Sequence, residues 1–313
     1  MKHLLSLRET PANEIGFLLQ TAAVFREILD RPIRKVPTLR GRSVVTLFYE
    51  SSTRTRTSFE MAAKIMSAEA VNVAVALSSV TKGESFKDTV QTLQALKADC
   101  IVIRHSASGA PAFAAARVDV PVINAGDGRH EHPTQALLDM LTMQQHFGRI
   151  EGLKVAIVGD VLHSRVARSN IWGLTKMGAK VTLAAPRTLM PEGTDGLPAA
   201  VADCLDEAVC GADVVMVLRL QNERMQAALV PNVREYSRLF GVTPARLRHA
   251  AHGLLVMHPG PVNRGVEISS DLVDGVDGIH TAIGEQVTNG IAVRMAALYI
   301  LMGGGSIGEP AAE

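Results

Sequence analysis

Short apolar runs alternate along the first half of the chain with segments whose apolar residues repeat at helical spacing. The apolar runs predict β-strands over residues 44–50, 71–75, 99–103 and 120–124. The helical spacing predicts helices from Thr10-Pro11 onward, over 86–96, and from 133 to about 146. Strands that alternate with helices predict a parallel, doubly wound α/β sheet, which binds ligands at the carboxyl ends of its strands.

The second half of the chain repeats this pattern. It predicts strands over residues 153–160, 180–184, 212–218 and 254–257. The glycine-containing stretch 148–152 marks a boundary, and 313 residues exceed what a single core usually holds. We therefore expect two doubly wound parallel-sheet (α/β/α) domains, residues 1–149 and 150–284. An apolar helix at about 285–302, with Val287 among its apolar residues, is expected to be buried and to return to the first domain across the domain junction.

The composition indicates a soluble globular enzyme. Hydrophobic residues make up 47% of the chain, and 32 Lys and Arg nearly balance 31 Asp and Glu, so no long-range field favours nucleic acid or an anionic membrane. Cys100, Cys204 and Cys210 show no paired spacing, which predicts buried free thiols in a reducing cytosol. The start of the chain lacks the long apolar region of a signal peptide, and Glu285 and Arg294 interrupt the C-terminal apolar segment. We expect a cytoplasmic protein.

The connection between the first strand and the next helix is rich in hydrogen-bond donors. Its sequence, residues 51–57, is Ser-Ser-Thr-Arg-Thr-Arg-Thr. Backbone N–H groups at a helix start favour an anion, Ser52, Thr53 and Thr55 add hydroxyl donors, and the Arg54 guanidinium can grip two phosphate oxygens. The segment therefore predicts a phosphate site. The alternative is an N-cap followed by solvated arginines.

Polar residues also follow the next two strands. Ser78 and Lys82 lie in a loop after residues 71–75, where a lysine with a functional role and a solvated loop lysine are equally favoured. Arg104 follows residues 99–103, at the carboxyl edge of the predicted sheet. That position favours contact with a ligand, and a surface ion pair is the ordinary alternative.

His132 precedes Pro133, a residue suited to the first turn of a helix. The positive end of the helix dipole disfavours protonation, so a neutral imidazole there can donate a hydrogen bond to a carbonyl oxygen. A capping or exposed histidine is the alternative.

The second domain offers cationic groups suited to carboxylates. The turn after residues 153–160 lacks the glycines of a dinucleotide fingerprint and places Arg165 at a helix start. Arg219 and Gln221 share one face of an extended chain and can bracket a second carboxylate. The Pro-Gly-Pro sequence around Gly260 and Pro261 predicts a rigid turn whose carbonyls can accept the hydrogens of an amine.

The sequence contains no metal-ligand set, no Ser or Cys nucleophile motif and no redox fingerprint. We therefore expect no metal and no cofactor. A transfer reaction that depends on positioning and electrostatics is the reaction type that remains.

Residues 48–60, Phe-Tyr-Glu-Ser-Ser-Thr-Arg-Thr-Arg-Thr-Ser-Phe-Glu, resemble the carbamoyl-phosphate signature of the aspartate and ornithine carbamoyltransferase family. The resemblance extends from about Ser43 to Leu301. It implies that carbamoyl phosphate is bound by Ser52, Thr53, Arg54, Thr55, Ser78, Arg104, His132 and Gln135. Within this set, Thr55, Arg104 and His132 would polarise the carbonyl oxygen, Gln135 would hold the carbamoyl NH2, and the catalytic residues would be Arg54, Thr55, Lys82, Arg104 and His132.

The resemblance also implies a homotrimer in which a neighbouring subunit inserts the loop of Ser78 and Lys82 into the active site. The residues that would bind the amino acid are Lys82, Arg165, Arg219, Gln221, Gly260 and Pro261, with a peptide bond before Pro261 that is often cis. The implied reaction converts carbamoyl phosphate and L-aspartate to N-carbamoyl-L-aspartate and phosphate, the committed step of de novo pyrimidine biosynthesis.

Several residues favour aspartate over ornithine. Family members that use ornithine carry a His-Cys-Leu-Pro turn and a Ser-Met-Gly segment, whereas this chain has Gly260 in the turn and no Ser-Met-Gly. Arg219 repels the cationic tail of ornithine. The alternatives are an ornithine or other amino-acid carbamoyltransferase, and a non-catalytic anion-binding relative.

The segments 163–170 and 258–265 resemble the bacterial branch of the family that associates with dihydroorotase or an inactive version of it. A dihydroorotase-like partner is therefore expected in preference to a zinc-bearing regulatory chain.

Overall fold

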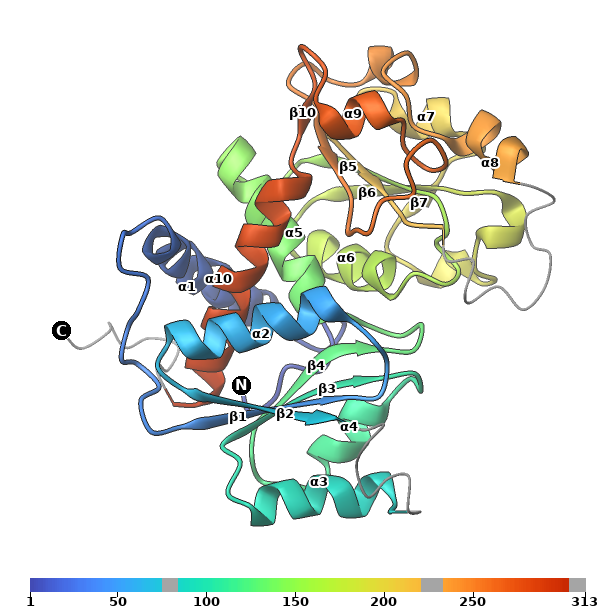
Figure 1. The fold of residues 1–313 in the computed structure, drawn as a ribbon. Helices are drawn as coiled ribbons and strands as arrows, with labels where there is room; N and C mark the ends of the chain where they lie inside the picture. The colour runs from blue at the N-terminus through green and yellow to red at the C-terminus, as the bar shows by residue number, and fades with distance from the viewer. Residues whose placement is uncertain (75–83, 221–232, 304–313) are drawn as a thin grey trace. The chain divides into compact units, whose positions relative to one another are not determined.

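The computed structural model describes residues 1–74, 84–220 and 233–303, which fall into two compact units. The first unit comprises Met1–Leu141 with the chain from Thr288 onward, and the second comprises Thr142–Val287. Each unit contains a parallel β-sheet with helices packed on it (Figure 1). The predicted α/β fold with two parallel sheets is confirmed. The exact domain boundaries, 1–149 and 150–284, stay predictions.

The sheet of the first unit has the strand order β2-β1-β3-β4. Its strands are β1 (Ser43–Phe48), β2 (Glu69–Ala74), β3 (Cys100–His105) and β4 (Val122–Asp127), all parallel. The helices that begin in this unit are α1 (Ala12–Leu29), α2 (Thr53–Ile65), α3 (Phe86–Ala95), α4 (Ala110–Ala115) and α5 (Pro133–Phe147).

Strands β1, β3 and β4 are mostly buried, as expected for nearly continuous apolar runs, whereas the edge strand β2 is largely exposed, with Val71 48% exposed. On one face, Val45, Leu47 and Ile101 pack with Val90 and Leu93 of α3. Figure 1 shows α3 on this side and α2 on the opposite side of the sheet. Because β1, β3 and β4 are parallel neighbours, their carboxyl ends lie next to one another at one edge of the sheet. The residues predicted to bind phosphate lie at or just after these ends.

The second unit has a sheet with the strand order β10-β9-β8-β5-β6-β7. Its strands are β5 (Lys154–Val158), β6 (Lys180–Ala184), β7 (Ala200–Val201), β8 (Val214–Val217), β9 (Leu255–Met257) and β10 (His280–Thr281). The helices are α6 (Arg165–Lys176), α7 (Leu205–Val209), α8 (Val233–Phe240) and α9 (Ser270–Asp274), with 3-10 turns at Arg187–Leu189, Thr194–Gly196 and Arg246–His249. A core that includes Val158, Val217 and Val256 lies between the sheet and α7.

Helix α10 (Ile283–Leu301) ends the described chain and returns to the first unit, as predicted. The rings of Tyr299 and Phe25 meet edge to face with centroids 5.6 Å apart, and Arg294 Nη1 donates to Ser58 Oγ at 2.9 Å. Most of the helix is buried, but the prediction was wrong for Val287, which is 58% exposed.

All three cysteines lie in the described part of the chain and are free. Cys100 is buried in β3, and burial raises the pKa of its thiol to about 12. The prediction of buried thiols was wrong for Cys204 and Cys210, which are exposed because they flank the short helix α7 at the surface. Within residues 1–74, 84–220 and 233–303, every helix is too short or too polar to cross a membrane.

Candidate active site

The predicted phosphate site lies at the start of α2. The helix begins at Thr53, and Ser52 occupies the N-cap position without a capping hydrogen bond from its side chain to the described residues. The first turn contains no acidic residue, and instead carries Arg54 at its second position. A cation at the positive end of a helix is unfavourable unless an anion is bound beside it. The phosphate site stays a prediction, which this cationic first turn without an acidic residue supports.

The side chains of this turn differ in their exposure to solvent. Thr55 is buried, Ser52 is half-buried, and Thr53 and Arg54 are exposed. Thr55 is fixed because it lies on the face of α2 that packs on the core, together with Phe59. The exposed and half-buried donors lie at the helix start, where a phosphate can meet both them and the backbone N–H groups.

Arg104 lies within β3, one residue before the strand ends, rather than just after the strand. Its backbone carbonyl accepts from the N–H of Tyr49 at 2.9 Å, so it sits beside the end of β1. Its guanidinium donates from Nη1 to the carbonyl of Ala125 in β4 at 3.2 Å and places Nε 3.2 Å from a carboxylate oxygen of Glu50. The side chain is 12% exposed, so this ion pair is not the solvent-exposed surface pair that was the alternative. Glu50 was not predicted to have a role; its position beside Ser51 and Ser52 was the available signal.

His132 immediately precedes α5, as predicted. Its carbonyl accepts from the backbone N–H groups of Gln135 and Ala136 at 3.0 and 3.3 Å, which makes it part of the first helical turn. The residue is 4% exposed, which rules out the alternative of an exposed histidine.

Gln135 follows in the first turn of α5. Its side-chain Nε2 donates to Oδ1 of the buried Asp139 at 3.1 Å, one turn further along the helix. Because the amide nitrogen is used in this bond, the amide oxygen is the atom that can accept from a substrate NH2 group. Asp139 was not predicted, although its spacing of four residues from Gln135 is typical of such a helical pair.

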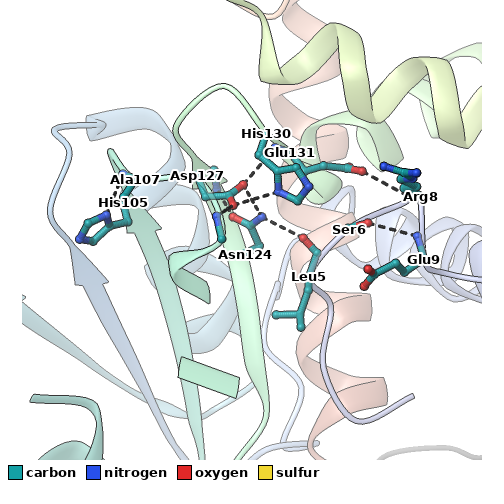
Figure 2. Close-up of polar contacts among 12 residues, drawn as sticks. Leu5, Ser6, Arg8, Glu9, His105, Ala107, Asn124, Asp127, His130 and Glu131 are labelled. Atoms are coloured by element: carbon teal, nitrogen blue, oxygen red, sulfur yellow. Dashed lines mark hydrogen bonds and ion pairs between the residues drawn. The ribbon is translucent and has the colours of Figure 1, made fainter. Parts of the chain in front are cut away.

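The loop that leads to His132 is organised by the buried carboxylate of Asp127, the last residue of β4. Figure 2 shows this carboxylate between Asn124 and His130. It accepts from the backbone N–H of Gly109 at 2.7 Å, from Asn124 Nδ2 at 2.9 Å, and from the backbone N–H of Glu131 at 3.0 Å, and lies 3.0 Å from His130 Nδ1. Burial alone would raise the pKa of Asp127, but the hydrogen bonds from His130, Gly109 and Asn124 outweigh it and hold the pKa below its usual range.

The N-terminal segment of the chain also forms hydrogen bonds with this loop. The carboxylate of Glu131, which is 1% exposed, accepts from the backbone N–H groups of Leu7 and Arg8 at 3.1 and 3.2 Å. Asn124 Nδ2 also donates to the carbonyl of Leu5 at 2.9 Å (Figure 2). His132 therefore follows a residue that is held by two backbone donors from the start of the chain.

In the second unit, Arg165 is the first residue of α6, as predicted, and is 4% exposed. Ser164 caps the helix by accepting from the backbone N–H of Ala167 at 3.1 Å. The preceding turn needs its glycine, because Gly159 has φ near +120° and a Cβ there would lie 3.1 Å from the carbonyl of Leu218. A buried cation at a helix start suits a carboxylate ligand.

Arg219 lies just beyond β8 and is half-buried. The other predicted members of this group cannot be placed in the same way: Gln221, Ser78 and Lys82 lie outside the described residues. The pairing of Arg219 with Gln221 on one face therefore stays a prediction.

The predicted rigid turn follows β9, and the peptide bond between Gly260 and Pro261 is cis. The backbone N–H of Gly260 donates to Nδ1 of His258 at 2.8 Å, and Nε2 of His258 lies 3.1 Å from a carboxylate oxygen of Glu267. The same oxygen accepts from the backbone N–H of Asn263 at 2.6 Å. Side chains behind the turn thus hold it on both flanks.

Over the ranges that the structure describes, no group of three or more His, Cys, Asp or Glu side chains is placed to hold a metal ion.

Comparison with known proteins gives matches along nearly the whole chain. Residues 2–145 match the family model described as "Aspartate/ornithine carbamoyltransferase, carbamoyl-P binding domain", and residues 151–301 match "Aspartate/ornithine carbamoyltransferase, Asp/Orn binding domain". The chain is 59% identical over 304 residues to the aspartate carbamoyltransferase catalytic subunit of Pelotomaculum thermopropionicum, with 97% of both chains covered. It is 57% identical over 303 residues to that of Moorella thermoacetica, with 97% of this chain and 98% of the relative covered.

Among solved structures, the chain resembles aspartate transcarbamoylase from Trypanosoma cruzi in complex with carbamoyl phosphate and aspartate. The TM-score is 0.85 at 32% identity, over 95% of this chain and 96% of the other. These matches cover both units described above, and the chain belongs to the aspartate/ornithine carbamoyltransferase family.

Proposed function

We propose that this protein transfers the carbamoyl group of carbamoyl phosphate to the α-amine of L-aspartate, which gives N-carbamoyl-L-aspartate and phosphate. This reaction is the committed step of de novo pyrimidine biosynthesis. The observation that carries the proposal is the cationic start of α2 beside Arg104, in a chain 59% identical to an aspartate carbamoyltransferase catalytic subunit.

The first unit binds carbamoyl phosphate. Its phosphate is held by the backbone N–H groups at the start of α2, by Ser52, Thr53, Arg54 and Thr55, and by Arg104. The support is the absence of an acidic residue in that first helical turn and the fixed position of Arg104 across β1 and β4. Ser78, which lies outside the described residues, is the remaining residue proposed to bind carbamoyl phosphate in this region.

The carbamoyl group itself meets three donors and one acceptor. Thr55, Arg104 and His132 polarise its carbonyl oxygen, and the amide oxygen of Gln135 accepts from its NH2 group. The orientation of Gln135 by Asp139 supports this assignment.

The second unit binds L-aspartate through Arg165, Arg219 and Gln221, which hold its two carboxylates, while Lys82 adds a further cation. The turn carbonyls at Gly260 and Pro261 receive the hydrogens of the amine. Arginine side chains attract a dicarboxylate and repel the cationic tail of ornithine. Arg165 supports this assignment by its position as the first residue of α6, where the positive end of the helix also favours a carboxylate.

In the reaction, the neutral α-amine of aspartate attacks the carbonyl carbon and a tetrahedral intermediate forms. Thr55, Arg104 and His132 stabilise its oxyanion. The C–O bond to phosphate then breaks, the amine nitrogen loses a proton, and the departing phosphate can accept that proton. Arg54, Lys82 and the start of α2 balance the charge that grows on the phosphate, and no covalent bond to the protein is needed.

The test of this function is carbamoyl transfer by the purified protein with L-aspartate and L-ornithine offered in parallel. Turnover with aspartate alone is expected. Turnover with ornithine would overturn the assignment of the second unit, and binding of phosphate without turnover would favour the non-catalytic alternative.

A homotrimer with active sites shared between subunits follows from the expected insertion of Ser78 and Lys82 by a neighbouring subunit. Mixing Lys82→Ala chains with Arg54→Ala chains should restore activity, because some sites in the mixed trimers carry neither substitution. If dissociated and reassembled mixtures show no more activity than either variant alone, the shared site is wrong.

A dihydroorotase or dihydroorotase-like partner is preferred to a regulatory chain, on the resemblance of segments 163–170 and 258–265 to the branch that has such partners. Co-elution of the protein with a purified dihydroorotase in gel filtration tests this association. A cytoplasmic location, in keeping with three free cysteines, also stays a prediction.

A further inference from the structure

A buried histidine–glutamate pair lies behind the turn at Gly260 and Pro261. The side chains of His258 and Glu267 are 0% exposed, and Nε2 of the ring lies 3.1 Å from Oε1 of the carboxylate. The other ring nitrogen, Nδ1, accepts from the backbone N–H of Gly260 at 2.8 Å. A nitrogen that accepts carries no proton, so the proton of a neutral ring is on Nε2, which faces the carboxylate. The two partners therefore select one tautomer of His258.

This tautomer connects the turn to the core of the second unit. The backbone N–H of His258 donates to Oε1 of the buried Gln286 at 3.0 Å, which fixes the end of β9. The carboxylate of Glu267 also accepts from the backbone N–H of Asn263 at 2.6 Å, which fixes the far side of the turn. Between these two anchors, the Gly260 N–H is held by the imidazole ring.

We propose that His258 is a positioning residue for the amino-acid substrate. Glu267 holds the ring with its proton on Nε2, so that Nδ1 fixes the Gly260 N–H and thereby the direction of the turn carbonyls. This inference rests on the proposed contact of Gly260 and Pro261 with the aspartate amine. His258 itself does not touch the substrate, since its side chain is fully buried. Its loss should weaken aspartate binding and leave carbamoyl phosphate binding in the first unit unchanged.

Two substitutions separate the two bonds of the ring. In His258→Asn, the amide oxygen can occupy the place of Nδ1 and accept from Gly260, but the side chain is too short to reach Glu267. In His258→Gln, the amide nitrogen can reach the place of Nε2 and donate to Glu267, but no acceptor remains for Gly260. A residue that only stabilises the second unit would not distinguish them in substrate affinity.

The experiment measures KM for aspartate, KM for carbamoyl phosphate and kcat on the full-length protein in its native assembly, with thermal unfolding as a check of folding. His258→Gln should raise KM for aspartate about tenfold, the effect of losing one hydrogen bond of ordinary strength, and change KM for carbamoyl phosphate less than about twofold. His258→Asn should raise KM for aspartate by less than about threefold. Glu267→Gln, which retains an acceptor oxygen, should also stay close to the unsubstituted protein.

An unchanged KM for aspartate in His258→Gln would overturn the inference, as would equal effects of the Asn and Gln variants. If His258→Gln does not fold, His258→Asn decides, because a tenfold rise of KM in that folded variant contradicts the proposal. Pro261→Ala separates this inference from the proposed site. If Pro261→Ala leaves KM for aspartate unchanged, the turn is not part of the amino-acid site, and both the proposed contact of the turn with aspartate and the role of His258 fail. If Pro261→Ala raises KM for aspartate while His258→Gln does not, only the role of His258 fails.

Discussion

Replacing Asp127 by alanine removes the carboxylate that organises the loop before His132. The carboxylate is 1% exposed and accepts from two backbone N–H groups, those of Gly109 and Glu131, and from Asn124 Nδ2. Each buried donor left without a partner costs about 1–3 kcal/mol, and the Gly109 N–H is partly open to water. We therefore expect the free energy of unfolding to fall by about 2–4 kcal/mol.

Asp127→Asn is the matched variant. It preserves the shape and one acceptor oxygen, while its NH2 group opposes the donors on the other side of the carboxylate. We expect it to lose about half as much unfolding free energy as Asp127→Ala. Because the loop also positions His132, both variants should lower kcat more than they raise KM for aspartate.

The assay is urea unfolding at pH 7, with kcat measured on the same preparations. Asp119→Ala, which removes an exposed carboxylate in the same unit, is the control and should cost less than about 0.5 kcal/mol. A loss below about 1 kcal/mol for Asp127→Ala would refute the reasoning, because it would mean that the buried donors find water or other partners at little cost.

The pH dependence gives an independent check. The pKa of Asp127 in the folded protein lies below its ordinary value of 3.8, so the stability that its charge contributes is fully present above that value. That contribution is lost as the pH falls through the lower folded-state pKa. The difference in unfolding free energy between the unsubstituted protein and Asp127→Asn should therefore be constant near neutral pH and shrink below pH 3.8. A difference that grows on acidification would contradict the sign.

Two further predictions concern Gln135 and the cysteines. Gln135→Glu puts a second carboxylate against Asp139 and near the bound phosphate, so calorimetry should show that the affinity for carbamoyl phosphate falls by about tenfold or more. Gln144→Glu, on the exposed side of α5, is the control and should have little effect. Equal effects of the two substitutions would contradict the assignment of Gln135. Because Cys100 is buried and burial raises the pKa of its thiol to about 12, iodoacetamide at pH 8 should alkylate the exposed Cys204 and Cys210 of the native protein and not Cys100. Mass spectrometry of the labelled protein checks this. Rapid labelling of Cys100 would contradict the prediction and would show that β3 opens readily.

The regular elements of the fold were predictable because their signals are local. The strand at Lys180–Ala184 matches its apolar run, and α5 begins at the proline that marked its first turn. The two-residue strands β7 and β10 were missed, since their pairing with β6 and β9 creates them, and the six-residue helix α4 was missed as well. The strand predicted over residues 120–124 was also placed too early in the chain, because β4 begins at Val122 and continues to Asp127.

The site shows the same division. The donors at the start of α2, His132 before α5 and Arg165 at the start of α6 were predictable because helix-start signals mark their positions. The long-range contacts that hold the site could not be predicted from the sequence. Glu131 accepts from Leu7, 124 residues away along the chain, and no local pattern indicates such a contact. Arg104 was identified, but its ion pair with Glu50 depends on the pairing of β1 with β3.

We propose that the first unit holds the phosphate of carbamoyl phosphate and that the second unit holds the carboxylates of aspartate. The decisive measurement is calorimetric titration of carbamoyl phosphate into Arg54→Ala and Arg165→Ala. Because a charge-assisted bond contributes about 1.5–3 kcal/mol, Arg54→Ala should weaken carbamoyl phosphate binding by at least about tenfold, while Arg165→Ala should bind it as tightly as the unsubstituted protein and instead show a raised KM for aspartate. Unchanged binding by Arg54→Ala, or an equal loss in both variants, would contradict the claim.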